Sequence, residues 1–419
     1  MTLFWHAHAS HPDWRTALAL AAAQIDAQAD ADRARRGPQG AAGRAGAPAA
    51  EARPTLGWVY LTDLYANDAG ALLAELQRRW PGVAWVGAVG VGVAANGIEY
   101  FDQPALVLML AAVPRERFRV FSGPQPLGGF AAHTAQVHAD PSSAELPTLI
   151  HELAARTATG YLFGGLASSR AQAPHIADGV FEGGVSGVAF GSDVALVSRV
   201  TQGCQPVGPT RRVTQAEHNL VLELDGQPAL DTLLGDLELD GLAPPEVLDA
   251  LRHTLVGLAD AADETLARPG QFGADTRVRH LIGIDPARRA IAVADVVEPG
   301  MRLAFCQRDT EAARRDLVRI CAEIREELEP EMLPLETVLA LQGTDAERQP
   351  HAARRIAGAI YVSCSGRGGP HFGAPSAELA IVRHALGDVP LAGFFAAGEI
   401  ARHHLYGYTG VLTVFVGDD

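Results

Sequence analysis

GAIYVSCSGRGG, residues 358–369, opens the stretch that sets the fold, and three further segments complete it: AELAIVRHALGD (377–388), VPLAGFFAAGEI (389–400) and GYTGVLTVFV (407–416). Residues 360–362 favour a strand, and the glycines that follow permit a tight turn. Leu379, Val382 and Leu386 recur at helical spacing, which predicts an amphipathic helix lying on a sheet. The last two segments predict apolar strands. The order is therefore strand, turn, helix, strand, strand.

Two polar segments interrupt these apolar runs at the points where the strands should end. Strand-and-helix scaffolds commonly hold ligands in the segments that follow their strands. We therefore expect a ligand site there, formed by Ser363, Cys364, Ser365, Gly366, Arg367, Gly368, Gly398 and Glu399.

Several segments resemble the FIST domains, which are sensory modules of bacterial signalling proteins and of some F-box proteins. The resemblance is carried by YVSCSGRG (361–368) with PLAGFFAAGEI (390–400), by GCQPVGP (203–209), by LGWVYLTDL (56–64) and by PGVAWVGAVGVG (81–92). It implies a mixed α/β fold with two related halves, FIST_N and FIST_C, each a mixed β-sheet flanked by helices. It also implies a sensor of small ligands, amino acids among them.

The predicted domain organisation follows from this resemblance and from composition. Residues 1–26 should form a strand and a helix that pack on the first half. Residues 27–54, rich in Ala, Gly, Pro and Arg, predict a disordered insertion because they cannot bury an apolar face. The FIST N-terminal domain should span 55–202 and the FIST C-terminal domain 203–419. Residues 228–267 predict an acidic, mainly helical region.

A weak internal repeat links the two halves. VYLTD (59–63) resembles IYVSC (360–364), and Gly87 and Gly92 have the same separation as Gly393 and Gly398. The repeat predicts two copies of a strand-helix-strand-strand unit. Chance similarity between apolar strands is the competing explanation.

Composition excludes several classes of function. The formal net charge of −15 argues against nucleic-acid binding. All 34 basic residues are arginine, so Schiff-base and P-loop lysines are excluded. The apolar runs fall short of the roughly 20 residues of a membrane span. The four cysteines lack the spacing of zinc ligands, and the sequence has no N-terminal signal. These two observations predict a reduced, cytoplasmic protein with no metal and no cofactor.

Three familiar motifs are incomplete. Residues 90–95 match GxGxxA, but an Asn-Gly turn follows where a dinucleotide site needs a helix, so tight strand packing is the better interpretation. Ser186 lacks the last glycine of a nucleophile elbow. The histidines at 6, 8, 11, 403 and 404 lack a pattern of ligands around them, and core or loop positions explain them better.

Arg367 and Glu399 are the residues on which the predicted ligand site depends. If their strands are neighbours, an amino acid could place its carboxylate on Arg367 and the loop amides, and its ammonium group on Glu399. An internal salt bridge between the two side chains is the alternative. Val93 and its apolar neighbours at 88–92 stand where many members of the family carry polar residues, so this segment should add no polar groups to the site.

The sequence therefore predicts a cytoplasmic, bacterial-type sensory protein that binds a small molecule and signals through a separate partner protein. Its first alternative is an enzyme with Cys364 as nucleophile, near Glu399 or His371, because backbone amides and Arg367 would favour a thiolate. Its second alternative is a ligand-free scaffold that docks partners on residues 228–267.

Overall fold

The computed structural model describes residues 3–36, 53–239, 244–261, 276–329 and 354–417. Within them the chain forms two compact units. The first contains 1–199, 318–404 and 411–419, and the second contains 200–317 and 405–410. The C-terminal half of the chain thus contributes to both units. The predicted division into a domain of 55–202 and one of 203–419 remains a prediction.

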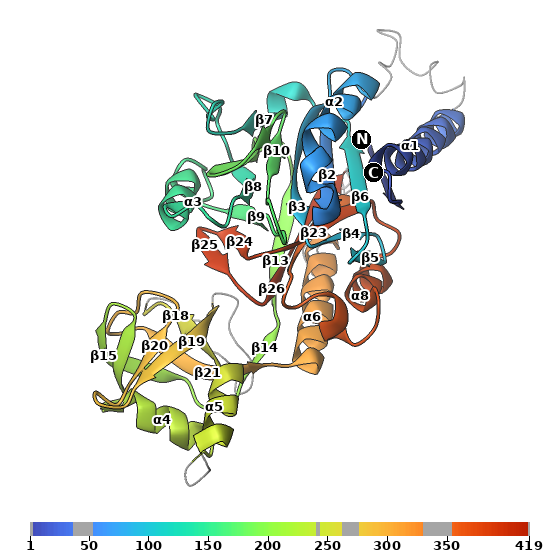
Figure 1. Cartoon of the computed structure of the whole chain (residues 1–419). Coiled ribbons are helices and arrows are strands. Elements are labelled where there is room, and N and C mark those ends of the chain that lie inside the picture. Colours follow the sequence, from blue (N-terminus) through green and yellow to red (C-terminus); the bar gives the residue numbers. More distant parts are fainter. Residues whose placement is uncertain (1–2, 37–52, 240–243, 262–275, 330–353, 418–419) are drawn as a thin grey trace, which may run out of the picture. The chain divides into compact units, whose positions relative to one another are not determined.

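The first unit contains a sheet covered by two helices. Its strands, in order across the sheet, are β1 (Phe4–Ser10), β6 (Ala105–Ala111), β2 (Leu56–Thr62), β3 (Ala84–Gly90), β10 (His175–Ala177) and β11 (Val180–Phe181). Strands β2 and β3 are parallel, because the helix α2 (Ala69–Arg79) connects them. The helix α1 (Trp14–Arg36) and α2 cover one face with a shared apolar core (Figure 1). The predicted mixed α/β class is confirmed.

A second sheet repeats this plan. Its strands are, in order, β13 (Leu196–Gln202), β26 (Thr409–Gly417), β22 (Arg355–Cys364), β23 (Leu391–Ala396), β4 (Gly92–Ala95) and β5 (Ile98–Phe101). Strands β22 and β23 are parallel and joined through the helix α8 (Ala377–Leu386), as β2 and β3 are joined through α2. The predicted sequence of strand, turn, helix and strand from Gly358 onward matches this arrangement. The matching strand order supports the predicted internal repeat.

The register corrects the predicted alignment of the repeat by one residue. Gly87 lies opposite Val59 and Gly393 lies opposite Tyr361, so Val59 corresponds to Tyr361 and not to Ile360. Both glycines are required by the same close contact. An added Cβ on Gly87 would lie 1.7 Å from the Val59 carbonyl oxygen, and one on Gly393 would lie 1.8 Å from that of Tyr361.

A third sheet lies mainly in the first unit. Its strands are, in order, β25 (His404–Tyr406), β24 (Glu399–Arg402), β9 (Leu162–Leu166), β8 (Thr134–Ala139), β12 (Val185–Phe190) and β7 (Phe118–Phe121). Tyr60 on β2 stacks on Phe394 of β23, with ring centroids 5.1 Å apart, and Trp58 donates a hydrogen bond to Gln136 of β8. Side chains from all three sheets therefore meet in one core. The helix α3 (Leu146–Ala155) lies between β8 and β9 in the chain.

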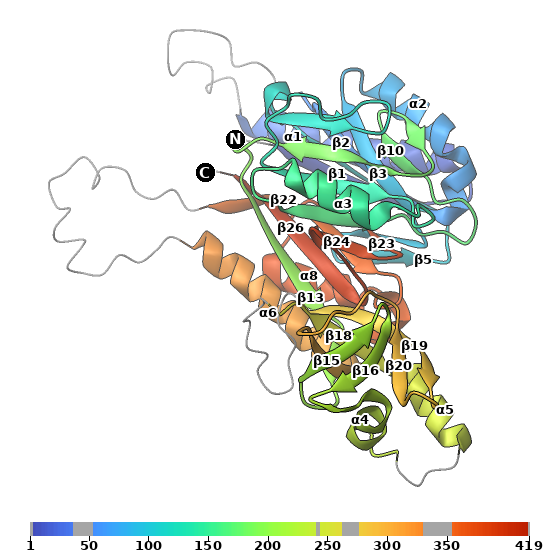
Figure 2. The same cartoon turned by 90° about the vertical axis from the view of Figure 1, so that its left-hand side faces the viewer.

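The second unit is a closed barrel. Its sheet runs β14 (Cys204–Pro206), β21 (Arg302–Arg308), β15 (Arg211–Glu217), β16 (Leu220–Leu224), β20 (Ala290–Val293), β19 (Arg277–Asp285) and β18 (Leu255–Ala259), with β17 (Gln227–Pro228) paired to β16. Strand β18 also pairs with β21, which closes the ring. The helix α4 (Ala229–Asp236) lies beside the barrel strands (Figure 2), and its Leu230 and Leu233 belong to the core of the barrel. The helix α5 (Pro244–His253) buries Leu251 in the same core.

Two local predictions need correction. The disordered insertion predicted for 27–54 is wrong for 27–36, because α1 continues to Arg36, and residues 37–52 lie outside the described residues. The helical region predicted for 228–267 contains α4 and α5 but also β18 of the barrel, and part of it lies outside the described residues.

The long helix α6 spans Thr310–Leu328. Strands β19 and β20 form a hairpin across Asp285-Pro286. The short helices η2 (Asp63–Asp68) and η3 (Arg115–Arg117) were not predicted.

Replacing Gly87 by alanine should destabilise the protein by about 3 kcal/mol, because overpacking of a strand contact forces the backbone to move. Gly70 is the matched control. It lies exposed in α2 with no atom within 4 Å of an added Cβ, so Gly70→Ala should stabilise by about 0.5–1 kcal/mol. Urea unfolding of both variants measures the difference. Equal effects of the two substitutions would contradict the assigned register.

Candidate functional site

The two polar segments predicted to form a site follow neighbouring strands. Cys364, the last residue of β22, lies opposite Ala396, the last residue of β23. Since the strands are parallel, both carboxyl ends meet at one edge of the sheet. The Ser365 amide donates a hydrogen bond to the Ala396 carbonyl at 2.8 Å, which ties the first segment to the end of the second strand. The two strands are neighbours, which is the condition on which the expected site depends.

The glycine-rich turn after β22 is shaped by its own backbone and by aromatic rings. The amides of Arg367 and Gly368 donate to the Cys364 carbonyl, at 2.9 and 3.0 Å. Added Cβ atoms at Gly368 and Gly369 would lie 2.0 Å from the ring of Phe395 and 3.0 Å from that of Phe101. Two of the amides predicted to hold a ligand carboxylate are therefore used inside the turn. Its glycines are required by packing against the two rings.

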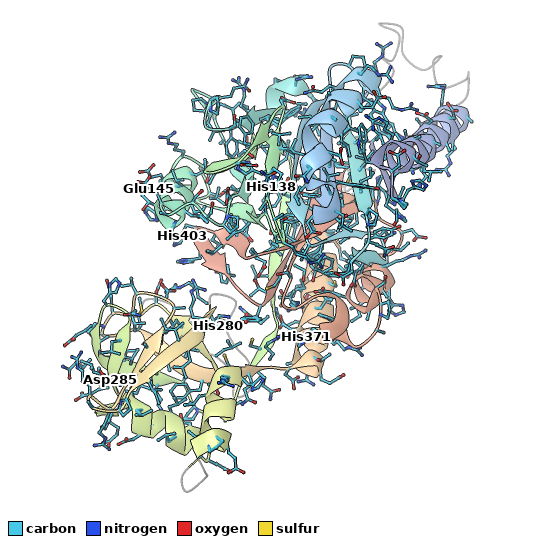
Figure 3. The ribbon with its side chains drawn as sticks, in the orientation of Figure 1. His138, Glu145, His280, Asp285, His371 and His403 are labelled. Carbon is cyan, nitrogen blue, oxygen red and sulfur yellow. The ribbon has the colours of Figure 1, made fainter. Side chains whose placement is uncertain are left out.

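A buried ion pair lies directly beside the turn. The Nε of Arg367 donates to Oε1 of Glu378 at 3.0 Å, and the two side chains are only 1% and 0% exposed. Glu378 belongs to the first turn of α8, so the pair fixes that helix to the end of β22. The Arg367 guanidinium also lies 5.4 Å from the centre of the Phe372 ring, within the range of a cation–π contact. Phe372 ends the short helix η4 (Gly369–Phe372), and the neighbouring His371 is labelled in Figure 3.

Two hydroxyl groups of β22 complete the environment of Glu378. The Tyr361 hydroxyl donates to Oε1 at 2.6 Å, and the Ser363 hydroxyl lies 3.0 Å from Oε1 and 3.1 Å from Oε2. Burial raises the pKa of Tyr361, and the negative charge of Glu378 raises it further. The tyrosine therefore remains a donor at neutral pH. Three donors on one carboxylate indicate that Glu378 is ionised.

A second buried carboxyl, that of Glu99, lies at the start of α8. Glu99 is on β5 and is 8% exposed. Its Oε1 accepts the Leu379 amide at 3.1 Å, and its own amide donates to the Ser376 hydroxyl at 3.0 Å. Its Oε2 is buried and accepts no hydrogen bond from the part of the chain that the structure describes.

Burial is the main cause of the raised pKa of Glu99. It raises the pKa of this carboxyl to about 7, and repulsion from Glu378 acts in the same direction. The amides of Leu379, Glu378 and Gly369 oppose the rise because they favour the carboxylate. The group therefore changes its charge near neutral pH.

The first half of the repeat lacks this polar cluster. Tyr361 and Ser363 correspond by register to Val59 and Leu61. Those two residues belong to an apolar core with Leu72 and Leu76 of α2. The strand-helix-strand unit therefore folds with a fully apolar interior in one half. The polar interior of the other half is not a requirement of the architecture.

Glu399 follows the second strand end, as predicted, and is buried as the first residue of β24. It lies opposite Gly165 of β9. An added Cβ on Gly165 would meet Val362 of β22 at 2.7 Å and Ala396 of β23 at 2.9 Å. Directly opposed residues point to the same face of a sheet. The Glu399 side chain thus lies on the face that packs against the ends of β22 and β23.

The remaining predicted site residues differ in their exposure. Ser365 is exposed and Gly366 is half-buried, whereas Gly398 is buried between the two strands it connects. Cys364 is buried at 7% exposure. The ligand site expected at Arg367 and Glu399 remains a prediction, as does the alternative salt bridge between them. The ion pair that the structure shows for Arg367 is with Glu378.

Sequence reasoning missed Glu378 and Glu99. Glu378 stands in the first turn of a helix, where an acidic residue usually stays in solvent and interacts with the helix dipole. Glu99 follows the Asn-Gly turn between β4 and β5, and nothing in its sequence context indicates burial. One signal was available: Glu378 directly precedes Leu379 and lies four residues before Val382, on the buried face of α8.

The other motifs are structural. Gly90 ends β3 and Gly92 begins β4, with no helix between them, which confirms strand packing over a dinucleotide site. Ser186 is buried and lies 2.6 Å from Nδ1 of the equally buried His175. A nucleophile must reach its substrate, so this pair serves packing. Among the described residues, no three His, Cys, Asp or Glu side chains gather as metal ligands would.

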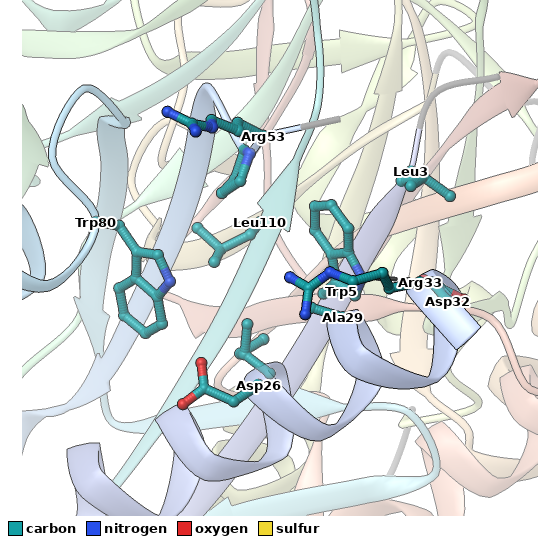
Figure 4. A pocket seen from close by; sticks show the side chains of 11 residues that line it. Leu3, Trp5, Asp26, Ala29, Asp32, Arg33, Arg53, Trp80 and Leu110 are labelled. Carbon is teal, nitrogen blue, oxygen red and sulfur yellow. Dashed lines mark hydrogen bonds between the residues drawn. The ribbon is translucent and has the colours of Figure 1, made fainter. Parts of the chain in front are cut away.

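A pocket of about 310 Å³ lies beside α1, on the helix-covered face of the first sheet. Figure 4 shows Trp5 and Trp80 among its lining residues, with Arg33 and Arg53 nearby. None of the predicted site residues lines it. Arg33 already pairs with Asp30 at 2.8 Å, and the Trp5 indole donates to Asp32 at 3.0 Å. The guanidinium of Arg33 and the indole N–H of Trp5 therefore already have partners within the protein.

Comparison with known proteins identifies the relatives of the chain. The model of the FIST N domain matches residues 55–227, and that of the FIST C domain matches residues 229–402. A protein of Mycobacterium tuberculosis, described as uncharacterized, is 32% identical over 400 residues, which cover 91% of this chain and 96% of the relative. A protein of Mycobacterium bovis, also described as uncharacterized, is 31% identical over 403 residues, covering 92% and 96%.

Replacing Arg367 by alanine should destabilise the protein by about 3–5 kcal/mol, because Glu378 would be left as a buried charge without its cation. Arg383, on the same helix, is the control. Its pair with Asp388 is exposed, so Arg383→Ala should cost no more than about 1 kcal/mol. Chemical denaturation of both variants measures the two costs. A loss of similar size in both variants would show that the buried pair is not a structural constraint.

Glu99 should make stability depend on pH. Its folded pKa of about 7 exceeds the ordinary value of 4.5, so the stabilising proton is fully present below pH 4.5 and is lost as the pH rises to 7. Relative to Glu99→Gln, the wild type should lose about 3 kcal/mol over this range. The measurement is the difference in unfolding free energy between the two proteins from pH 5 to pH 8. A difference that does not change with pH would contradict the assignment.

Proposed function

The chain belongs to the FIST family, a family of sensory and signal-transduction domains, and on this basis we propose that it is a cytoplasmic sensor of a small polar ligand. The ligand binds at the carboxyl ends of β22 and β23. An amino acid is the class of ligand that fits best, because the segments after these strands carry a cation at Arg367 and a carboxyl at Glu399. No helix among the described residues is long and apolar enough to cross a membrane.

The buried cluster around Arg367 is the observation that carries the proposal. Burying ionised groups costs free energy, and well-packed apolar residues would stabilise the same fold equally well or better. The first half shows such a replacement, with Val59 and Leu61 in place of Tyr361 and Ser363. A polar interior that the architecture does not need, at a strand-end edge, is typical of a binding site.

Two features of the structure argue against the alternatives. The Cys364 side chain is only 7% exposed, whereas a nucleophile must reach a substrate. The scaffold alternative uses residues 228–267 as a docking segment. The described part of this segment is instead built into the barrel, because α4 and α5 bury leucines in its core and β18 is one of its strands. The sensor signals through a separate partner protein, for which the family's role in signal transduction is the support.

A thermal-shift screen of the purified chain against the standard amino acids tests the proposal. A ligand at 100 times its dissociation constant should stabilise the protein by about 2.7 kcal/mol. The variant Glu399→Gln keeps the shape of the side chain but removes its charge, and it should lose the shift. Arg383→Ala should retain the shift. A panel in which no compound raises the melting temperature would remove the support for a sensor of amino acids.

A further inference from the structure

The charges around the start of α8 do not balance. Both oxygens of Glu378 are engaged, Oε1 by Tyr361, Ser363 and Arg367, and Oε2 by Ser363. The positive charge of Arg367 is thereby matched. The carboxyl of Glu99 is a further acidic group beside this ion pair. The charged neighbour that shifts its pKa is Glu378, which repels a negative charge on Glu99 and so raises that pKa.

The elements packed against Glu99 supply few other charges. Strand β4, its partner in the sheet, offers the buried apolar residues Val93, Ala94 and Ala95. The short helix η4 offers the Gly369 amide and the half-buried His371. The helix α8 offers its first amides, Glu378 and, further along, the exposed Arg383, which pairs with Asp388.

The two oxygens of this carboxyl differ in their hydrogen bonds. Oε1 is held by the Leu379 amide, but Oε2 is buried and accepts no hydrogen bond from the described residues. A buried carboxylate oxygen without a donor is costly, and it can be relieved by a proton or by a cationic donor. An ammonium group carries three N–H donors and one positive charge. It would satisfy Oε2 and would also balance the charge of the cluster.

We propose that Glu99 binds the ammonium group of the ligand, so that a side chain of the first half completes the site of the second half. The inference rests on the proposed function, and it assigns the ammonium group of the ligand to Glu99 in place of Glu399. The ligands that fit are primary amines, including amino acids. Organic acids without an amino group do not fit this position.

The proposal predicts that ligand binding is coupled to the release of a proton. The ligand binds as an ammonium ion to the ionised carboxyl, so a protonated Glu99 must release its proton to solvent as the complex forms. Free carboxyl and ammonium ion therefore give the ion pair and one proton, and no bond other than the O–H bond breaks. Affinity should fall about tenfold for each pH unit below 7 and become constant above it.

Thermal shift and isothermal titration calorimetry on the full chain test the proposal. The probes are the standard L-amino acids, butylamine as an amine without a carboxylate, and propionate and succinate as acids without an amino group. Only compounds with an amino group should bind to the wild type. Their affinity should rise about tenfold between pH 6 and pH 8. Glu99→Gln should lower it at least tenfold at pH 8, whereas Arg383→Ala should leave it unchanged.

The outcomes separate the two proposals. Binding of propionate or succinate alone overturns the role of Glu99 and leaves a sensor of small acids. Amine binding that is independent of pH, or equal in Glu99→Gln, also overturns that role while the sensor of amino acids stands. No binding by any probe overturns both. The pH series in the wild type needs no variant, so it decides the question even if Glu99→Gln fails to fold.

Discussion

The buried ion pair of Arg367 and Glu378 is the constraint on which the C-terminal part of the first unit depends. It joins the turn after β22 to the first turn of α8, with neither side chain exposed by more than 1%. Once both charges are buried, moving one of them away would leave the other as a buried charge without a partner. The helix, the turn and the strand end are therefore held together. The hydroxyls of Tyr361 and Ser363 extend the same constraint along β22.

The two sheets of the repeat show how one architecture can hold two chemistries. Gly87 and Gly393 allow the same close contact between parallel strands, and α2 and α8 occupy the same place in the order of elements. The interior between strand and helix is apolar in one copy and ionised in the other. The strands β4 and β5 follow β3 in the chain but add to the second sheet. This crossing brings Glu99 from the first half to the start of α8.

The local sequence pattern predicted the helices and strands well, but it did not predict which side chains contact one another. Strand formers at 360–362, apolar spacing along α8 and glycines after β22 were enough to predict strand, turn and helix. They also placed Arg367 and Glu399 after strand ends, and the structure shows that these strands are neighbours. The partner of Arg367 could not be predicted, since burial of Glu378 depends on how α8 sits on the sheet. Strand β18 was missed for the same reason. Its five residues lie within a region whose sequence predicts helix, and it is their pairing with other strands of the barrel that makes them a strand.

The arrangement around α8 suits a sensor better than it suits a rigid scaffold. A ligand can shift a protein between states only if it interacts differently with each of them. A cluster with one cation and two carboxyls provides that difference, because a proton or an added cation changes the electrostatic free energy of the buried group by several kcal/mol, whereas an apolar core would not respond. Since Glu99 also accepts the Leu379 amide, its charge acts directly on the start of α8. The helix that closes the buried pair is thus the element whose position would report occupancy of the site.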